Sequence, residues 1–246
     1  MAITISEERG VRFLHFGSPW VQGAMRIARP WALELEYTRE LMAPLLLHGP
    51  AWPRSVLQVG LGSASVTKFI HRHRPEAKIT VVEIDPDVIT AARLHFRLPE
   101  EGPRLRIVLG DAAEHVAQRE KRHDLIVVDG YDEKGRPGML DSEPFYANCL
   151  QRLTSQGAIS VNLLTRTRGV KASVDRLLRA FDNRVLVLPP SDAGNIVAIA
   201  LAGETVDESF SRLRETARRL KAATGLDLAP TLARLAKERG GDRISF

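Results

Sequence analysis

Four segments that are acidic or rich in glycine each follow a short apolar run, and together they have the chemistry of a nucleoside site. They are Gly60-Leu61-Gly62, Glu83, Asp111 and Asp129. A glycine turn lets the backbone approach a ligand closely, and a carboxylate accepts hydrogen bonds from ribose hydroxyls. Asp129 directly follows an apolar run, where loss of water raises the pKa of a carboxylate and suits it to act as a base. One such acid is often only a helix cap, so the series of four indicates a site.

The loop that follows Asp129 has an acidic balance within a basic chain. Residues 129–145 contain five acids and two bases, whereas the whole chain has a formal net charge of +5. The five acids are Asp129, Asp132, Glu133, Asp141 and Glu143. An acidic loop with several glycines suits a mobile lid over a cationic substrate, and Tyr131 offers an aromatic face to a cation. A solvated loop without function is the alternative.

The elements that must position these residues alternate between strand and helix. Helices are expected at about 63–73, 85–96, 112–120, 143–153 and 170–181, and apolar runs predict strands at 55–60, 78–84, 105–109, 124–129, 158–163, 185–188 and 195–201. The alternation predicts a doubly wound, Rossmann-like α/β fold with a mostly parallel sheet. The last two runs are joined by a loop too short for a crossover helix, so the seven-stranded sheet should end in an antiparallel pair.

Both ends of the chain add to this unit. Near-alternation in residues 1–36 predicts a small N-terminal β-meander, and residues 37–246 form the main domain with a helical tail from about 204. A helical pattern over 31–47 connects the two parts. Ser63 or Ser65 is expected to cap the first helix of the main domain, and Ser142 the helix from Glu143.

Composition excludes several classes of protein. With 246 residues and 44% hydrophobic residues, the chain can bury a sizeable core. No apolar run approaches the roughly 20 residues that span a bilayer, and no secretory signal is visible. The single cysteine, Cys149, excludes an intrachain disulfide and fits a cytoplasmic location. The basic residues form no nucleic-acid motif and the seven histidines no metal-ligand spacing, so we expect neither nucleic acid nor metal.

With these residues assembled, the chain resembles the spermidine synthase (polyamine aminopropyltransferase) family from about Val11 to Leu201. The resemblance rests on three motifs, Val81-Val-Glu-Ile-Asp85, Gly110-Asp-Ala112 and Asp124-Leu-Ile-Val-Val-Asp-Gly-Tyr-Asp132, which follow the meander and Tyr37. It implies a fold of the S-adenosylmethionine-transferase type and a homodimeric enzyme. The implied reaction moves an aminopropyl group from decarboxylated S-adenosylmethionine to a small cationic amine, a di- or polyamine such as putrescine.

The resemblance also implies roles for single residues. Asp129 is similar to the base that takes a proton from the attacking amine, and Asp132 to the lid carboxylate that holds the polyamine. Tyr37 resembles a substrate-side tyrosine, beside Tyr131. The nucleoside side of the site would use Gln22, Gly60, Gly62, Ser63, Glu83, Asp111 and Ala112.

One departure from the family leaves the reaction open. The family carries an aspartate in the glycine turn, which binds the free amine of the decarboxylated ligand, and this chain has Ser63 there. A serine neither attracts that amine strongly nor repels the carboxylate of ordinary S-adenosylmethionine. A methyltransferase is therefore the alternative, although such enzymes commonly have an acid where this chain has Gln58. A non-catalytic nucleoside-binding module is a further alternative, as is a nicotinamide dehydrogenase, which Asp111 and the antiparallel pair disfavour.

Overall fold

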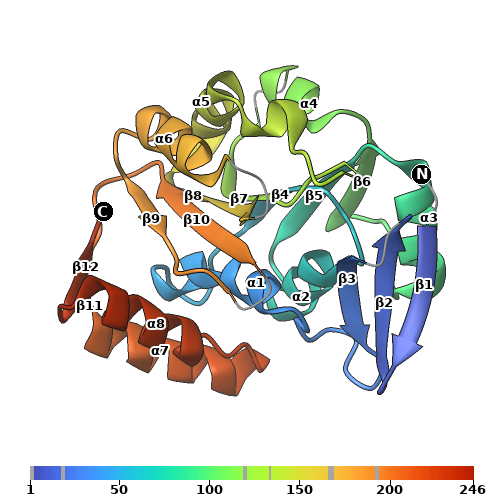
Figure 1. Ribbon diagram of the computed structural model, residues 1–246, viewed down its shortest axis with the longest axis horizontal. Helices are drawn as coiled ribbons and strands as arrows, with labels where there is room; N and C mark the ends of the chain where they lie inside the picture. Colours follow the sequence, from blue (N-terminus) through green and yellow to red (C-terminus); the bar gives the residue numbers. More distant parts are fainter. Residues whose placement is uncertain (1–2, 18–19, 119–120, 133, 166–168, 192–193) are drawn as a thin grey trace.

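The structure, a computed structural model, is described for residues 3–17, 20–118, 121–132, 134–165, 169–191 and 194–246, so Glu133 lies outside it. A small antiparallel sheet precedes the main sheet (Figure 1) and consists of β1 (Ile3–Glu8), β2 (Val11–Phe16) and β3 (Val21–Arg26). These strands match the predicted meander. The division of the chain at residues 36 and 37 stays a prediction.

The main sheet has seven strands in the order β6-β5-β4-β7-β8-β10-β9. They are β4 (Ser55–Val59), β5 (Lys78–Glu83), β6 (Leu105–Leu109), β7 (His123–Val128), β8 (Leu153–Leu164), β9 (Val185–Val187) and β10 (Asn195–Leu201). The strands from β6 to β8 are parallel, and β10 runs antiparallel to both β8 and β9. The predicted fold class is confirmed, including the antiparallel end of the sheet.

Helices cover both faces of this sheet (Figure 1), which explains why the central strands are apolar without interruption. Side chains alternate along β4, so Val56 packs in the cluster of one face and Leu57 in that of the other. The first face packs against α2 (Ser65–His73) and α3 (Pro86–His95). The second packs against α4 (Ala112–Gln118), α5 (Glu143–Gln151) and α6 (Val170–Ala180).

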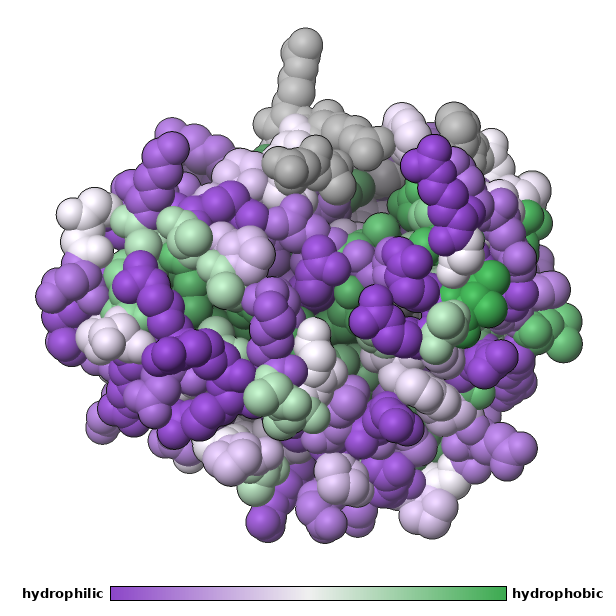
Figure 2. All heavy atoms as spheres, turned by 90° about the horizontal axis from the view of Figure 1, so that it is seen from below, coloured by the Kyte–Doolittle hydropathy of each residue, from purple (hydrophilic) through white to green (hydrophobic). Residues whose placement is uncertain are grey.

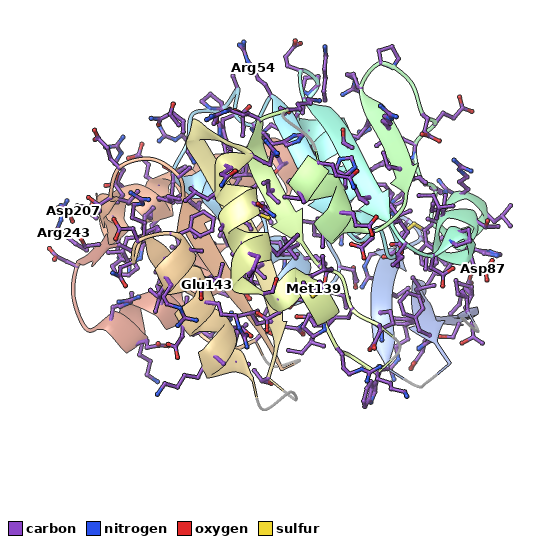
Figure 3. The ribbon with its side chains drawn as sticks, turned by 90° about the horizontal axis from the view of Figure 1, so that it is seen from above. Arg54, Asp87, Met139, Glu143, Asp207 and Arg243 are labelled. Atoms are coloured by element: carbon purple, nitrogen blue, oxygen red, sulfur yellow. The ribbon has the colours of Figure 1, made fainter. Side chains whose placement is uncertain are left out.

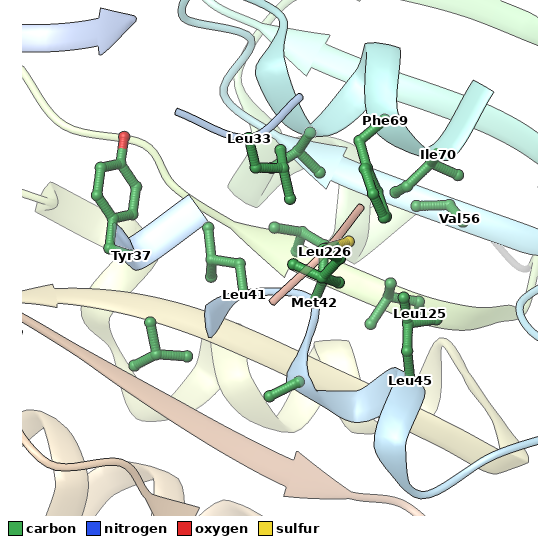
Figure 4. Close-up of a cluster of buried hydrophobic side chains, with 14 of the residues drawn as sticks. Leu33, Tyr37, Leu41, Met42, Leu45, Val56, Phe69, Ile70, Leu125 and Leu226 are labelled. Atoms are coloured by element: carbon green, nitrogen blue, oxygen red, sulfur yellow. The ribbon is translucent and has the colours of Figure 1, made fainter. Parts of the chain in front are cut away.

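The connection between the two sheets differs from the single helix predicted over 31–47. It contains a short helix α1 (Glu36–Glu40) and a 3₁₀ helix η1 (Ala43–Leu46). Pro44 lacks an N–H and its ring would clash with the carbonyl of Glu40, so an α-helix cannot continue through it. Figure 4 shows the apolar side chains of this connection packed against α2, with Tyr37 at the margin of the cluster and its hydroxyl directed away from Leu41.

The C-terminal tail, predicted to be helical from about 204, is helical and also carries two short strands that were not predicted. It has two helices, α7 (Phe210–Thr224) and α8 (Ala229–Arg239), framed by the paired strands β11 (Asp207–Ser209) and β12 (Arg243–Ser245). The tail packs back on the main domain, since Leu232 and Leu235 are buried in the first-face cluster. Within the described residues, none of the helices has the length and apolar character needed to cross a membrane.

Candidate functional site

The carboxyl ends of five parallel strands line up along one edge of the main sheet. In spatial order from β6 to β8 they carry Asp111, Glu83, the Gly60–Gly62 turn, Asp129 and Asn162. From β4 the chain winds outward to β6, and from β7 it winds the other way to β8. Ligands of open α/β sheets bind at such a switch point, here between β4 and β7. The structure therefore brings together, along one edge, all four segments that the sequence singled out.

The Gly60–Gly62 turn is tightly fixed where β4 meets β7. Gly60 has a φ of +83°, and a Cβ added there would lie 2.1 Å from the backbone oxygen of Asp129. Only glycine permits this approach. The amide of Gln58 holds the turn from below, because its Nε2 donates to the Gly60 carbonyl over 2.8 Å and its Oε1 accepts from Thr67 over 2.7 Å.

The two serines after the turn do not cap α2, contrary to our prediction. The N-cap position is held by Ala64, in a left-handed conformation with φ of +56° and without a side-chain cap. The hydroxyls of Ser63 and Ser65 instead bond to each other over 2.9 Å, and Ser65 donates to the Ala24 carbonyl of β3 over 3.0 Å. Their polar atoms are thus satisfied by each other and by the neighbouring strand.

Strand β3 packs directly on the glycine turn, through a residue that our sequence analysis missed. A Cβ added to Gly23 would lie 2.5 Å from the Ser63 hydroxyl oxygen, so only glycine lets β3 come this close. The Gln22 carbonyl lies 3.6 Å from where a Cβ on Gly62 would stand, which brings Gln22 to the predicted nucleoside side. An isolated glycine within a strand pattern is the signal that could have identified Gly23.

Glu83 connects the end of β5 to the turn. Its Oε2 accepts the N–H of Leu61 over 2.8 Å, and its Oε1 accepts those of Ile84 and Asp85 over 2.8 and 3.0 Å. Burial raises the pKa of this carboxyl above its ordinary value, although the three N–H groups act in the opposite direction. A carboxylate has about four lone-pair positions, so one remains for a ligand hydroxyl.

Asp111 serves as a helix cap at the same edge. Its Oδ1 accepts the N–H groups of Ala113 and Glu114 over 2.6 and 3.3 Å, at the start of α4. The side chain is exposed, whereas the neighbouring Ala112 is buried. The cap accounts for the acid here and leaves its second oxygen facing away from the helix bonds.

Asp129 lies at the centre of a network of side-chain hydrogen bonds. Its Oδ1 accepts from Asn162 Nδ2 over 2.8 Å, and Asn162 Oδ1 accepts from Asn195 Nδ2 over 2.9 Å. Tyr37 contributes a further hydrogen bond. Burial raises the pKa of Asp129 and the nearby charge of Glu83 adds to this, while the bonds from Asn162 and Tyr37 lower it; the net pKa is raised.

Asn162 and Asn195 did not emerge from the sequence analysis. Both are buried, and their side chains bond diagonally across the antiparallel pair of β8 and β10, in which Asn195 is opposite Leu164 and Asn162 is opposite Val197. The signal that could have found Asn162 is an amide near the carboxyl end of an otherwise apolar strand, since a buried polar side chain requires a partner.

Asp132 of the predicted lid is held within its own loop. Its Oδ1 accepts the N–H groups of Lys134 and Arg136 over 2.9 and 2.8 Å, and its Oδ2 accepts Nε of Arg136 over 2.8 Å. Burial acts to raise the pKa of this carboxyl, but these donors outweigh it and the pKa is lowered. Tyr131 turns its hydroxyl toward β8, where it donates to the carbonyl of Asn162.

Two other acids of the lid have structural partners. Asp141, which ends the 3₁₀ helix η2 (Gly138–Asp141), accepts from Tyr146, Ser173 and Arg176 over 2.9, 2.7 and 2.9 Å. Glu143 pairs with an arginine of α6 over 2.9 Å. Both acids therefore fasten the end of the lid to α5 and α6, and the predicted cap by Ser142 is confirmed.

The edge can thus bind a polar nucleoside beside Glu83 and hold a partly buried proton acceptor at Asp129. Among the residues that the structure describes, no cluster of three or more His, Cys, Asp or Glu side chains is arranged to bind a metal ion.

Comparison with known proteins agrees with this architecture. The spermine/spermidine synthase domain matches residues 34–166. A polyamine aminopropyltransferase of Neisseria meningitidis serogroup A is 36% identical over 95% of this chain and 88% of its own length.

Solved structures share the fold. A probable spermidine synthase from Corynebacterium glutamicum superposes with a TM-score of 0.75 at 20% identity, covering 89% of this chain and 83% of its own. Human methyltransferase-like protein 13, in complex with SAH, superposes with a TM-score of 0.69 at 25% identity. The match covers 78% of this chain and 93% of that protein's chain. Because the family match covers more than half of the chain and the Neisseria relative aligns over nearly all of it, the chain belongs to the spermine/spermidine synthase family and is a transferase.

Proposed function

We propose that this transferase moves an aminopropyl group from decarboxylated S-adenosylmethionine to a di- or polyamine such as putrescine, with Asp129 as the base. The observation that carries the proposal is the partly buried Asp129 carboxylate with a raised pKa, at the switch point beside the glycine turn. Relatives named polyamine aminopropyltransferases support aminopropyl transfer in polyamine synthesis.

The residues along the sheet edge fit an S-adenosyl ligand. Glu83 keeps a lone pair for a ribose hydroxyl after accepting three backbone N–H groups. The turn at Gly60 and Gly62 places no side chain between the backbone and the ligand. Asp111 and Ala112, at the end of the next strand, are assigned to the adenine side.

Asp129 is suited to remove a proton from the attacking amine. The amine nitrogen attacks the methylene carbon beside the sulfonium; a C–N bond forms while the C–S bond breaks, and its electron pair stays on the sulfur of 5′-methylthioadenosine. The amine proton passes to Asp129. Asn162 and Tyr37 each donate one hydrogen bond to the carboxylate, and about two lone-pair positions remain to accept the proton. A raised pKa makes this carboxylate a stronger proton acceptor than an exposed one.

Asp132 would hold a second cationic group of the amine. In the described structure its partner is the guanidinium of Arg136, on the same loop. An ammonium group that takes the place of this guanidinium keeps the carboxylate paired. Tyr37, bonded to Asp129, lies on the substrate side of the base.

Methyl transfer from ordinary S-adenosylmethionine is the second candidate. Ser63 has no charge to select the free amine of the decarboxylated ligand, and its hydroxyl already bonds to Ser65. The likeness to methyltransferase-like protein 13 favours the same candidate. The retained Asp129 and Asp132 favour aminopropyl transfer.

Paired calorimetry with the two sulfonium compounds, each with and without putrescine, separates these candidates. We expect tighter binding of the decarboxylated form, and mass spectrometry should find an aminopropylated amine together with 5′-methylthioadenosine. Preferential binding of the carboxylated form, with a methylated product, would replace the first candidate by the second.

A further inference from the structure

A hollow of about 380 Å³ lies at the amino-terminal ends of β5, β6 and β7. This is the edge of the sheet opposite to Asp129, which follows the carboxyl end of β7. Figure 3 shows both edges, with Arg54, which precedes β4, at one of them and Met139 of the lid toward the other. The hollow is therefore separate from the proposed reaction site.

The hollow lies beside α4 on the same part of the sheet. The described residues of α4, Ala112–Gln118, follow the carboxyl end of β6 and run back toward its amino-terminal end, and His115 of this helix lines the hollow. Thr80 and Arg106, paired across β5 and β6, also line the hollow.

Among the described residues that line the hollow none is acidic, and Lys78, Arg104, Arg106 and Lys121 carry positive charge. The other ionisable residues of this described lining are His115 and His123. Arg104 is bonded over 3.1 Å to each of two backbone carbonyls, those of His71 and Pro75. The side chains of Lys78, Arg106 and Lys121 are exposed.

His123 also lines the hollow. It is buried and contacts the Ser55 hydroxyl over 3.1 Å. Burial lowers its pKa to about 4, and the nearby positive charges of Lys121 and His115 contribute to the lowering. A positive potential at a concave surface concentrates anions.

We propose that this basic hollow binds a small polyphosphate, either free or carried by a nucleotide. Three exposed cations on flexible stems match a ligand with three or more negative charges, and the fork of Arg106 suits phosphate oxygens. The Thr80 hydroxyl adds a neutral donor at the floor. The volume falls within the range of small-molecule pockets, and a concave surface of this size suits a compact anion better than an extended nucleic acid. This inference does not depend on the proposed reaction.

Calorimetry with sodium tripolyphosphate, ATP and a single-stranded RNA homopolymer tests the proposal at fixed ionic strength. Saturating 5′-methylthioadenosine is included, so that the adenosine part of ATP cannot report on the nucleoside site. We expect one tripolyphosphate per chain. Equal affinity for ATP assigns the site to the free anion, and higher affinity for ATP assigns it to a nucleotide.

The double variant Arg106→Gln/Lys121→Gln should weaken tripolyphosphate binding at least ten-fold. Its matched control is Arg218→Gln/Lys237→Gln, which removes the same charge from exposed positions on α7 and α8 and should change the affinity less than two-fold. Circular dichroism verifies that both variants are folded. Equal weakening in the two variants, or no saturable binding by the unaltered protein, would overturn the proposal. Binding of the RNA without tripolyphosphate would overturn it in favour of a nucleic-acid surface.

Discussion

The Asp129 carboxylate has two oxygens in different situations. Oδ1 accepts the amide of Asn162, which is itself held by Asn195, so the plane of the carboxylate is set by β8 and β10. Because buried polar groups that lack partners are costly, this chain of amides specifies one orientation of the acid. The base proposed here therefore depends on two residues that never touch the substrate.

Replacing the base tests its role. We expect Asp129→Asn to lower kcat on the order of a hundred-fold or more, because the amide cannot accept the amine proton. Binding of the sulfonium donor should change little, since Glu83 and the glycine turn are untouched. Steady-state kinetics and donor calorimetry measure the two quantities, and a variant that keeps full turnover would refute the assignment of Asp129 as base.

Removing Asn162 tests the positioning of that base. The hydrogen bond from Asn162 lowers the pKa of Asp129, so Asn162→Leu should raise it. Because only the ionised carboxylate accepts a proton, activity is lost as pH falls through this pKa. The acid limb of the kcat/KM profile should therefore move to higher pH.

Thr165→Val is the matched control for this shift, since Thr165 bonds the Gly194 carbonyl at the same end of β8. A ¹³C NMR titration of the Asp129 carboxyl follows the pKa without relying on activity. An unchanged pKa in the Asn162 variant would show that the amide does not act on the base.

Single residues were predicted from sequence where their place in the chain sets their place in space. Glu83 and Asp129 lie at the carboxyl ends of parallel strands, and these ends share one edge of the sheet. The order of elements therefore predicts that the two side chains lie near each other. Asn195 could not be found in this way, because its contact with Asn162 depends on the register between β8 and β10. The mutual bond of Ser63 and Ser65 was missed since a serine before a helix ordinarily predicts a cap.

At the scale of elements, the lid loop between Asp129 and α5 contacts the helices at its C-terminal end, whereas its N-terminal part forms hydrogen bonds within the loop. Asp141 ties its end to α5 and α6, while Asp132 is paired with Arg136 of the same loop. An amine substrate must compete with this guanidinium for Asp132. The acidic lid is thus partly neutralised from within the loop.

Relief of that competition is expected in Arg136→Gln. Exposed ion pairs contribute roughly 0.2–1 kcal/mol, so the KM for the amine should fall about two- to five-fold while kcat changes little. Lys134→Gln is the matched control, because it removes the same charge from the same loop without removing a side-chain donor of Asp132. A KM that stays unchanged in Arg136→Gln, or that falls equally in both variants, would show that the pair does not compete with substrate.

Elements were predicted best where the hydrophobic period is regular over a complete strand or helix. The alternation from β4 to α6 has this property, and its central strands β4 and β7 are buried on both faces. The connection over 31–47 lacks it, because its apolar residues are buried on several sides and Pro44 interrupts the helix. Strands β11 and β12 have only three residues each and pair with a distant partner, so local pattern cannot reveal them.

For the whole molecule, the C-terminal tail is joined to the helix that carries Tyr37. Arg234 of α8 pairs with Glu36 over 2.6 Å and also with the fully buried Glu40, which accepts from Thr231 over 3.1 Å. On the face shown in Figure 2, hydrophilic side chains alternate with small apolar patches. The tail therefore packs on α1 through the contact of Arg234 and Thr231 with the buried Glu40.

The buried Glu40 should make stability depend on pH. Burial raises the pKa of Glu40 from 4.5 to about 7, although Arg234 acts to lower it. Between these values the unfolded chain has lost its proton and the folded chain has kept it, so stability falls as pH rises, by roughly 3 kcal/mol in total.

In Glu40→Gln this contribution is absent, and the free energy of unfolding in urea should fall less between pH 5 and pH 8 than in the unaltered protein. Glu36→Gln removes the other carboxylate of Arg234 and a minor charge that raises the Glu40 pKa, so it should reduce the pH dependence less than Glu40→Gln does. Equal pH dependence in the unaltered protein and Glu40→Gln would contradict the raised pKa.

A homodimer is what the family resemblance implies, and it stays a prediction. Sedimentation velocity over a range of concentrations measures it: we expect one species of twice the chain mass, and a species of single-chain mass throughout would contradict the expectation.

The bond between Arg234 and Glu40 joins residues 194 positions apart in the chain. During synthesis at about 5–20 residues per second, Arg234 appears some 10–40 s after Glu40. Until then Glu40 has no arginine of α8 beside it, and α1 cannot reach its final arrangement. The helix that carries Tyr37 is made early on the ribosome yet settles late, so a nascent chain should acquire its complete substrate side only after α8 has been translated.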